Sequence, residues 1–465
     1  MPSPERTTSP VLPKNVAPSR TRYFVVVFAV TLAILSYIDR VAISKAAPFI
    51  TQDLHLTKDQ MGLIFGSFAL AYALAEIPGG WLGDYMGPRR VLMRIVIWWS
   101  FFTASAGWMW SFWSLRINQF LFGLGEAGCF PNLTKAFTTW LRPQERVRAQ
   151  GIMWMSARWG GAFTPLICVT LYQFMNWRIA FAVFAMLGVV WAVLFYRWFR
   201  DNPKDHPKVN AAEWEILEPN QKLIGSHGDV PWGKLIRSRT VVFLWIQYFL
   251  ITYPWYFYIT WLSTYLEEAK GLSKTTSAWY AIFPLFFGGI GCVTSGFLLP
   301  HVAEWFGGDV RKARRTTAII GFLGASAFMV LCLKQEDPLL GMLAMGMASF
   351  CNDLVMPCAW GACMDVGGKY AGTVSGSMNM FGNLAGFFAP WTGGVILTGA
   401  LWAGTWAPAD LIRLLAQNIS HWTGIPGGDY RIFLYTMAAA YFLGALCWPF
   451  IDPVTPMEQD DHHHA

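Results

Sequence analysis

Charged side chains are scarce in this chain of 465 residues. Asp, Glu, Lys and Arg make up 14% of it, whereas 54% of the residues are hydrophobic. Soluble globular proteins carry about 25% charged residues, so the composition excludes that class. The 43 Gly, 25 Trp and 35 Phe are typical of packed membrane helices. The sequence therefore predicts a polytopic membrane protein.

Cysteine is also scarce, and no cysteine has metal-ligand spacing with a histidine. All eight cysteines fall inside apolar segments, where a thiol packs as a small hydrophobic group. They are Cys129, Cys168, Cys292, Cys332, Cys351, Cys358, Cys363 and Cys447. Because no nucleophile–base or metal constellation is present either, an enzyme has no support. We expect no metal and no organic cofactor.

Long apolar runs are abundant and predict twelve transmembrane helices. They are expected near 22–47, 60–82, 91–112, 114–137, 147–174, 177–199, 240–266, 276–301, 315–334, 338–364, 371–400 and 430–451. The longest polar interruption, 201–239, divides them into six and six. Two such halves are a repeat signature of secondary transporters. The predicted fold is all-α, with two pseudo-symmetric six-helix halves.

The predicted organisation has five parts. These are a disordered tail at 1–21, an N-terminal bundle at 22–200, a central loop at 201–239, a C-terminal bundle at 240–452 and a tail at 453–465. An insertion at 401–429 contains the amphipathic run ADLIRLLAQNISHW. This insertion is either an interfacial helix on the outer face or a long loop.

Basic residues gather in alternate loops and at the N-terminal tail. They are Arg20, Arg22, Arg89, Arg90, Arg94, Arg142, Arg146, Arg148, Arg237, Arg239, Arg311, Lys312, Arg314 and Arg315. Cytoplasmic loops of membrane proteins carry this excess, so both termini and the central loop are predicted to be cytoplasmic. The net charge of +7 then reflects topology in an inner-membrane bilayer, not affinity for nucleic acid. We expect a monomer.

The loop after the second predicted helix reads GWLGDYMGPRRVL. Gly80 and Gly87 permit a tight turn and close helix approach. Asp84 can form a charge clamp at the helix ends with Arg89 and Arg90.

With this loop the chain resembles the major facilitator superfamily. Further stretches resemble its anion:cation symporter branch, which includes bacterial sugar-acid/proton symporters. They are YIDR at 37–40, FGLGEAGCFPN at 122–132, PQERVRAQG at 143–151, GGAFTP at 160–165, FYITWLSTYL at 257–266 and GNLAGFFAP at 382–390. The resemblance covers residues 22–400 and implies a secondary transporter.

Ionisable residues occur deep inside the predicted helices. Asp39 and Arg40 lie far into the first helix, where an unpaired charge costs at least ~2.5–3.5 kcal/mol. We hypothesise that Arg40 attracts an anionic substrate or Glu126 of the fourth helix, while Asp39 faces a helix interface and titrates. A carboxylate whose surroundings alternate can change protonation, as proton coupling requires. In the resembled symporters the residues matching Asp39 and Glu126 are the proton-coupling pair, so a proton is the expected coupling ion.

The resemblance also implies substrate-binding residues in the N-terminal half. Tyr37 and Arg40 border the site, and Tyr72 is a hydroxyl donor to substrate. Position 119 is usually an arginine that binds the substrate carboxylate, but here it is Gln119. We predict that Arg158 of the fifth helix supplies this anion-binding charge instead. The alternative is a structural or snorkelling arginine.

Glu76 in the second predicted helix is another departure, since the resembled proteins more often have a neutral amide there. Glu76 is either a third proton-coupling group or a partner for Arg94 or Arg158.

The C-terminal half offers uncharged polar groups. Tyr253 and Tyr256 lie on the seventh predicted helix and Asn379 and Asn383 on the eleventh. Each buried donor needs an acceptor, so this cluster suits the hydroxyls of a polyol or sugar acid. The tenth helix adds Asn352 and Asp353. Polar helix packing is the alternative explanation for each residue taken singly.

The sequence thus predicts a proton-coupled importer of a small organic anion such as a hexuronate, aldonate or aldarate. An organic-anion (phosphate-exchange) or drug/proton antiporter is a second possibility within transport. A non-transporting membrane receptor or scaffold, with 201–239 or 401–429 as its interaction part, is a third.

Overall fold

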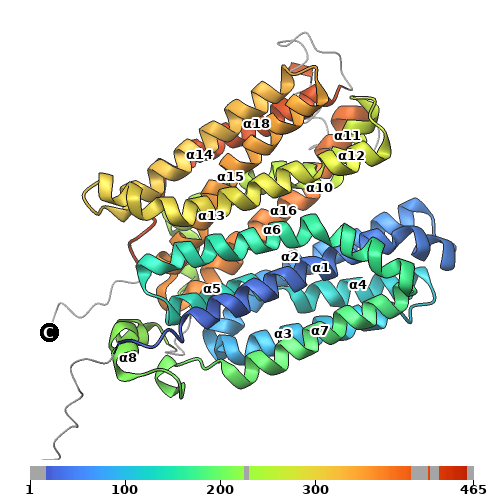
Figure 1. The fold of residues 1–465 in the computed structure, drawn as a ribbon. Coiled ribbons are helices and arrows are strands. Elements are labelled where there is room, and N and C mark those ends of the chain that lie inside the picture. Colours follow the sequence, from blue (N-terminus) through green and yellow to red (C-terminus); the bar gives the residue numbers. More distant parts are fainter. Residues whose placement is uncertain (1–16, 225–229, 399–416, 419–428, 458–465) are drawn as a thin grey trace, which may run out of the picture.

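The computed structural model describes residues 17–224, 230–398, 417–418 and 429–457. Every regular element in these residues is a helix, and the helices form two bundles (Figure 1). The N-terminal half contains α1 (Tyr23–Asp53), α2 (Lys58–Met86), α3 (Pro88–Ala106), α4 (Phe112–Glu126), α5 (Cys129–Trp140), α6 (Pro143–Phe174) and α7 (Trp177–Trp198). The all-α, two-half fold agrees with the prediction.

The C-terminal half follows a short linker region. The linker contains α8 (Ala211–Leu217) and α9 (Trp232–Arg237), with 3₁₀ turns at Pro203–Asp205 and Glu218–Leu223. The second bundle contains α10 (Arg239–Thr260), α11 (Leu262–Glu268), α12 (Lys274–Tyr280), α13 (Ile282–Trp305), α14 (Val310–Leu333), α15 (Pro338–Gly367), α16 (Ala371–Thr398) and α18 (Tyr430–Cys447). Two further 3₁₀ turns lie at Gly368–Tyr370 and Trp448–Phe450. The amphipathic run predicted at 401–429 lies outside the described residues apart from 417–418.

Each predicted span corresponds to one helix or to two consecutive helices. Three spans hold two α-helices each: the seventh divides into α10 and α11, the eighth divides into α12 and α13, and the fourth breaks at Ala127 and Gly128 into α4 and α5. Gly128 adopts φ +79°, a left-handed conformation that glycine takes without steric cost. Among the described residues, seven helical segments are long and apolar enough to cross a membrane by length and composition alone.

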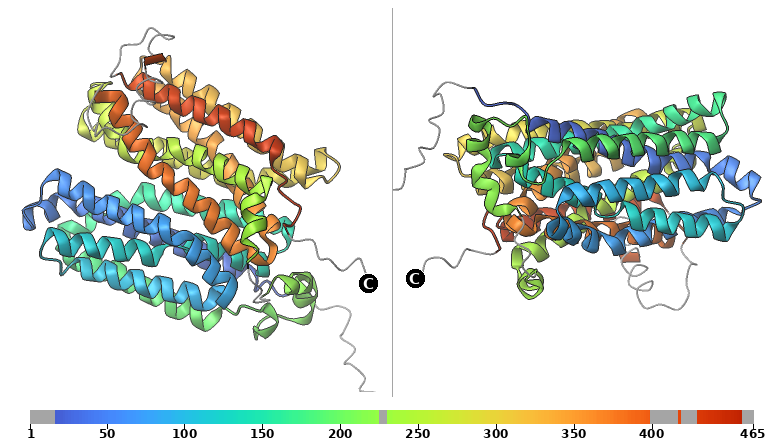
Figure 2. Two further views of the ribbon diagram at one scale, coloured as in Figure 1. Left: turned by 180° about the vertical axis from the view of Figure 1, so that it is seen from behind. Right: turned by 90° about the horizontal axis from the view of Figure 1, so that it is seen from below.

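The two halves meet along two helix pairs, α2 with α16 and α6 with α13 (Figure 1). Figure 2 (left) shows them close together at the end that carries α8 and spread apart at the opposite end. Glycines allow the close approach, because a Cβ on Gly376 would lie 2.7 Å from the carbonyl oxygen of Glu76. We call the end that carries α8 the closed end and the opposite end the open end.

Asp84 joins the halves at the closed end. Its carboxylate accepts hydrogen bonds from the N–H groups of Gly372 (3.0 Å) and Thr373 (2.6 Å) at the start of α16. Lys135 of α5 lies 3.5 Å from the same carboxylate. An acid at a helix N-terminus is favoured by the helix dipole and by the free N–H groups there.

The predicted clamp between Asp84 and the arginine pair is wrong. The side chain of Arg89 donates to the carbonyl of Tyr196 in α7 (3.0 and 2.8 Å), and Arg90 is exposed. The physical reason is the turn at Gly87, with φ +83°, which directs the start of α3 toward α7 while Asp84 faces α16. Both predicted glycine roles hold, since Gly80 packs against the backbone of Gly372.

A second link at the closed end runs through Asp365 of α15. Arg146 of α6 donates to it at 2.8 Å, and Arg314 of α14 lies at 2.7 Å. Asn220 of the linker accepts from Arg146 at 3.1 Å. The linker is therefore built into the contact between the halves.

Candidate functional site

Arg40 and Glu126 form a buried ion pair inside the N-terminal half. Arg40 Nε donates to Glu126 Oε1 at 2.8 Å, and the Ser36 hydroxyl donates to the same oxygen at 2.5 Å. Glu126 is fully buried, whereas the Arg40 side chain keeps 19% of its surface exposed. Of the two partners hypothesised for Arg40, the structure contains Glu126. Glu126 is the last residue of α4, so the helix break directly follows the ion pair.

Aromatic rings surround the guanidinium group of Arg40. The ring centroids of Tyr72 and Tyr37 lie 4.3 and 5.6 Å from its central carbon. Phe68 and Phe130 follow at 5.7 and 5.8 Å. Such cation–π contacts contribute about 0.5–2 kcal/mol each. They stabilise the positive charge of the Arg40 guanidinium group. Glu126 accepts a hydrogen bond from its Nε, which is only one of the five N–H donors of an arginine side chain.

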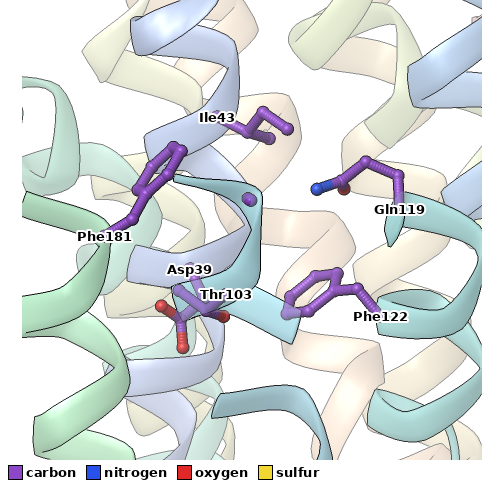
Figure 3. Close-up of a pocket in the computed structure, with 7 residues that line it drawn as sticks. Asp39, Ile43, Thr103, Gln119, Phe122 and Phe181 are labelled. Atoms are coloured by element: carbon purple, nitrogen blue, oxygen red, sulfur yellow. The ribbon is translucent and has the colours of Figure 1, made fainter. Parts of the chain in front are cut away.

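Asp39 points away from Arg40, as the predicted rotation of about 100° along a helix requires. It lines a small cavity together with Thr103 of α3, Gln119 of α4 and Phe181 of α7 (Figure 3). Asp39 Oδ1 and Thr103 Oγ1 have no hydrogen-bond partner among the residues that the structure describes. The cavity measures about 10 Å³, which is room for roughly one water molecule. Gln119 therefore belongs to the surroundings of Asp39.

Glu76 lies in the contact between the two halves. Asn379 of α16 donates to its Oε1 at 2.7 Å and also lies 3.5 Å from the Tyr72 hydroxyl. Neither of the partners suggested from the sequence is used. Arg94 is exposed on α3 and contacts a methionine sulfur, because Glu76 faces α16 on the other side of α2. Glu76 and Tyr72 thus connect the aromatic surroundings of Arg40 to the C-terminal half.

Arg158 does not reach Glu76 because it is engaged elsewhere. Its Nε and Nη2 donate to Asp353 of α15 at 2.7 and 2.9 Å, and the guanidinium carbon lies 3.6 Å from the ring centroid of Trp255. Asn352 also donates to Asp353, at 2.9 Å. Sequence reasoning noted Asp353 only as a polar residue. No local pattern connects it to an arginine 195 positions away.

The polar residues of the C-terminal half separate into two places. Tyr256 donates to Asn383 at 3.0 Å, and Asn383 donates to the carbonyl of Asn379 at 2.8 Å, which extends the cluster from Glu76. The Tyr253 hydroxyl instead bonds Thr392 (2.8 Å) and Thr436 (3.1 Å). In this conformation Tyr253 is a packing residue within its own half.

These contacts form one array across the middle of the molecule. Its members are Ser36, Tyr37, Arg40, Tyr72, Glu76, Glu126, Tyr256, Asn379 and Asn383. Ionic groups come from the N-terminal half and neutral hydrogen-bonding groups from the C-terminal half. In such an array the carboxylate of a ligand can replace that of Glu126 at Arg40, and the neutral groups can hydrogen-bond hydroxyl groups of the same ligand.

The sequence profile of the Major Facilitator Superfamily matches residues 29–390. The chain belongs to this superfamily. It is a multi-pass membrane protein and a secondary transporter, not an enzyme. Its fold is similar to that of other superfamily members, as two solved structures illustrate. The proton:xylose symporter XylE gives a TM-score of 0.68 at 13% identity, over 94% of this chain and 98% of that one.

The fucose:proton symporter FucP of Escherichia coli gives a TM-score of 0.67 at 13% identity, over 95% of this chain and 100% of that one. At such identity the likeness concerns the fold.

Three curated superfamily relatives are more similar in sequence. A probable sulfoacetate transporter of Cupriavidus necator, SauU, is 34% identical over 80% of this chain and 86% of that protein. A probable galactarate/D-glucarate transporter of E. coli, GudP, is 30% identical over 80% and 86%. A hexuronate transporter of Bacillus subtilis is 28% identical over 85% and 92%. These relatives confirm the resemblance to the anion:cation symporter branch.

Proposed function

We propose that this chain is a proton-coupled symporter that imports a small organic anion of the sugar-acid class across an inner membrane. The observation that carries the proposal is the buried pair between Arg40 and Glu126, at 2.8 Å. An anion and Glu126 compete for the same guanidinium group. Protonation of Glu126 removes the competitor, so that a proton and an anion bind together.

The surrounding residues supply the remaining parts of the proposal. Glu76, beside Tyr72 in the array, and Asp39, adjacent to Arg40 in the chain but outside the array, are buried acids and are further proton-coupling candidates. Tyr72, Tyr256 and Asn383 would hydrogen-bond substrate hydroxyls. Of the substrates named for the relatives, hexuronate, galactarate and D-glucarate carry both acidic and hydroxyl groups, whereas sulfoacetate carries two acidic groups and no hydroxyl. The shared acidic group supports an anionic substrate, and the hydroxyl groups of the first three support the assignment of hydrogen-bonding residues.

The basic loops support a direction of access. Arg146 and Arg314 bind Asp365 at the closed end, where α8 also lies. Arg89 lies at the start of α3, and its backbone N–H donates to Asp201, the residue from which the linker region begins. The positive-inside tendency supports a cytoplasmic closed end, with both termini on that side. The open end would then admit anions from outside, and rocking of the halves would release them inside.

A liposome assay tests the coupling. Purified protein is reconstituted, and accumulation of D-glucarate, D-galacturonate and sulfoacetate is measured under an imposed inward proton gradient. We expect Glu126→Gln to lose gradient-driven accumulation but to keep counterflow exchange, because glutamine cannot carry the proton. Glu215→Gln on the exposed face of α8 is the matched control and should behave as wild type. Undiminished accumulation by Glu126→Gln would contradict the proposal, and uptake driven by an outward proton gradient would favour an antiporter.

A further inference from the structure

The ion pair between Arg158 and Asp353 differs from ordinary contacts between the halves. It is bidentate, with N–O distances of 2.7 and 2.9 Å. Only 4% of the Arg158 side chain and 1% of the Asp353 side chain are exposed. The arginine comes from α6 and the aspartate from α15, so the pair spans the boundary between the halves. It lies away from Asp365, which makes the separate link at the closed end.

Burial makes each partner depend on the other. An isolated charge in a low-dielectric interior is strongly disfavoured, and removing one member of a buried pair leaves the other uncompensated. For Asp353 the compensation comes from Arg158 and from one hydrogen bond donated by Asn352. Arg158 has the ring of Trp255 as its second support.

The other titratable groups around Asp353 are neutral at physiological pH. They are the thiol of Cys292 on α13 and the hydroxyls of Tyr258 on α10 and Tyr441 on α18. Gly288 and Ser349 complete the contact surface on α13 and α15. A separation from Arg158 therefore leaves the carboxylate of Asp353 with no cation among these neighbours, and protonation is the way to remove its charge.

We infer that Asp353 is a further proton-coupling residue, and that an acidic group of the substrate and Asp353 compete for Arg158. This inference rests on the proposed function, since it requires an anionic substrate. The step is balanced: one substrate carboxylate or sulfonate takes the place of Asp353 on Arg158, and one proton from the same aqueous side adds to the released carboxylate oxygen. The net charge around Arg158 stays the same, so each loading of Arg158 adds one proton to the transport cycle.

The arrangement repeats at Arg158 what Glu126 does at Arg40. Tyr37 connects the two places, since its ring centroid lies 5.6 Å from the guanidinium carbon of Arg40 and its side chain packs on Gly161, one turn after Arg158. Two arginines, each neutralised by its own carboxylate, suit a substrate with two acidic groups. A diacid would load two protons at these sites and a monoacid one.

The test measures how binding depends on pH. Affinities of purified protein for D-glucarate, sulfoacetate and D-galacturonate are determined by titration calorimetry at pH 6, 7 and 8. The affinity of the wild-type protein should fall as the pH rises, because binding takes up protons. For the two diacids, D-glucarate and sulfoacetate, we expect this fall to be smaller in Asp353→Asn by up to tenfold per pH unit, because one linked proton disappears. At pH 8 Asp353→Asn should bind these diacids more tightly than wild type, by at least fivefold. Asp365→Asn, which removes an acid from the closed end, should leave the pH slope unchanged.

A second variant covers a failure of Asp353→Asn to fold. Arg158→Gln with Asp353→Asn removes both charges together and leaves no uncompensated ion. We expect it to fold and to bind the diacids at least tenfold more weakly than wild type at pH 6. A double variant that binds as wild type would overturn the inference, as would an unchanged pH slope in Asp353→Asn. Wild-type protein that neither binds nor transports any of the three acids would instead overturn the proposed function, and the inference with it.

Discussion

Glu145, in the first turn of α6 and outside the predicted span 147–174, gathers three donors at the closed end. Tyr23 and Arg142 donate to its Oε1 at 2.9 Å each, and Arg22 donates at 3.2 Å. Burial opposes ionisation of the carboxyl, but the hydrogen bonds from Arg142, Arg22 and Tyr23 outweigh it and lower the pKa of Glu145 to about 2. This one residue ties the start of α1 to the start of α6.

The lowered pKa of Glu145 predicts how its contribution varies with pH. A depressed carboxyl pKa stabilises the folded state above its unfolded value of about 4.3, and this contribution is lost as pH falls toward 2. We expect Glu145→Gln to lower the midpoint of thermal unfolding by roughly 1–3 °C at pH 7, since the group is partly solvated. The difference from wild type should shrink between pH 4 and pH 3. Thermal scans in detergent check this, and an equal difference at pH 7 and pH 3 would contradict it.

At the residue scale, the sequence predicted which buried positions carry charged side chains, but it did not predict which residues these side chains bind. Helix geometry separated Asp39 from Arg40, and the structure has them on different faces. The assignment of Glu76 to Arg94 or Arg158 failed because Glu76 faces α16, while Arg94 is exposed on α3 and Arg158 binds an aspartate of α15. Contacts between the halves, such as Arg158 with Asp353, join positions 195 residues apart. Spacing along one helix carries no information about such pairs.

At the scale of elements, the break between α4 and α5 positions Glu126 beside Arg40. The left-handed Gly128 packs directly on Gly79 of α2, and a Cβ at position 128 would lie 2.6 Å from the Gly79 Cα. Neither backbone can yield without moving its helix. The break therefore depends on both glycines.

We expect Gly128→Ala to destabilise the protein by at least ~1–2 kcal/mol, the cost of a left-handed alanine before the contact with Gly79 is counted. Its transport activity should fall as well, because α4 ends at Glu126. Gly62→Ala is a matched control, since a Cβ at Gly62 in α2 meets nothing within 4 Å. Thermal unfolding of the two variants side by side is the measurement. Equal midpoints for both would show that the break tolerates a side chain.

Apolar runs were sufficient to predict the spans but not this break. Apart from Glu126, the residues from 120 to 131 are apolar or glycine or proline, so hydropathy shows a single helix across the break. A signal was present in the spacing of Gly125, Gly128 and Pro131, because proline is tolerated in the first turn of a helix. Pro131 is the third residue of α5.

At the scale of the whole molecule, the bond from Asp84 to the start of α16 holds the closed end together. We expect Asp84→Asn to accelerate hydrogen exchange of the amides at 372–373 by at least threefold, because these N–H groups lose a charged acceptor. Exchange mass spectrometry reports this directly, with α18 as an internal reference remote from the contact. Unchanged exchange at 372–373 would mean that other contacts keep the halves closed.

The buried cysteines have a practical consequence for watching the halves move. All eight thiols lie inside the protein and none forms a disulfide. A membrane-impermeant fluorophore maleimide should therefore leave the natural chain almost unlabelled. Single engineered cysteines at the tips of the two halves would then carry dyes without prior removal of native thiols, so that energy transfer between them can follow rocking in single molecules.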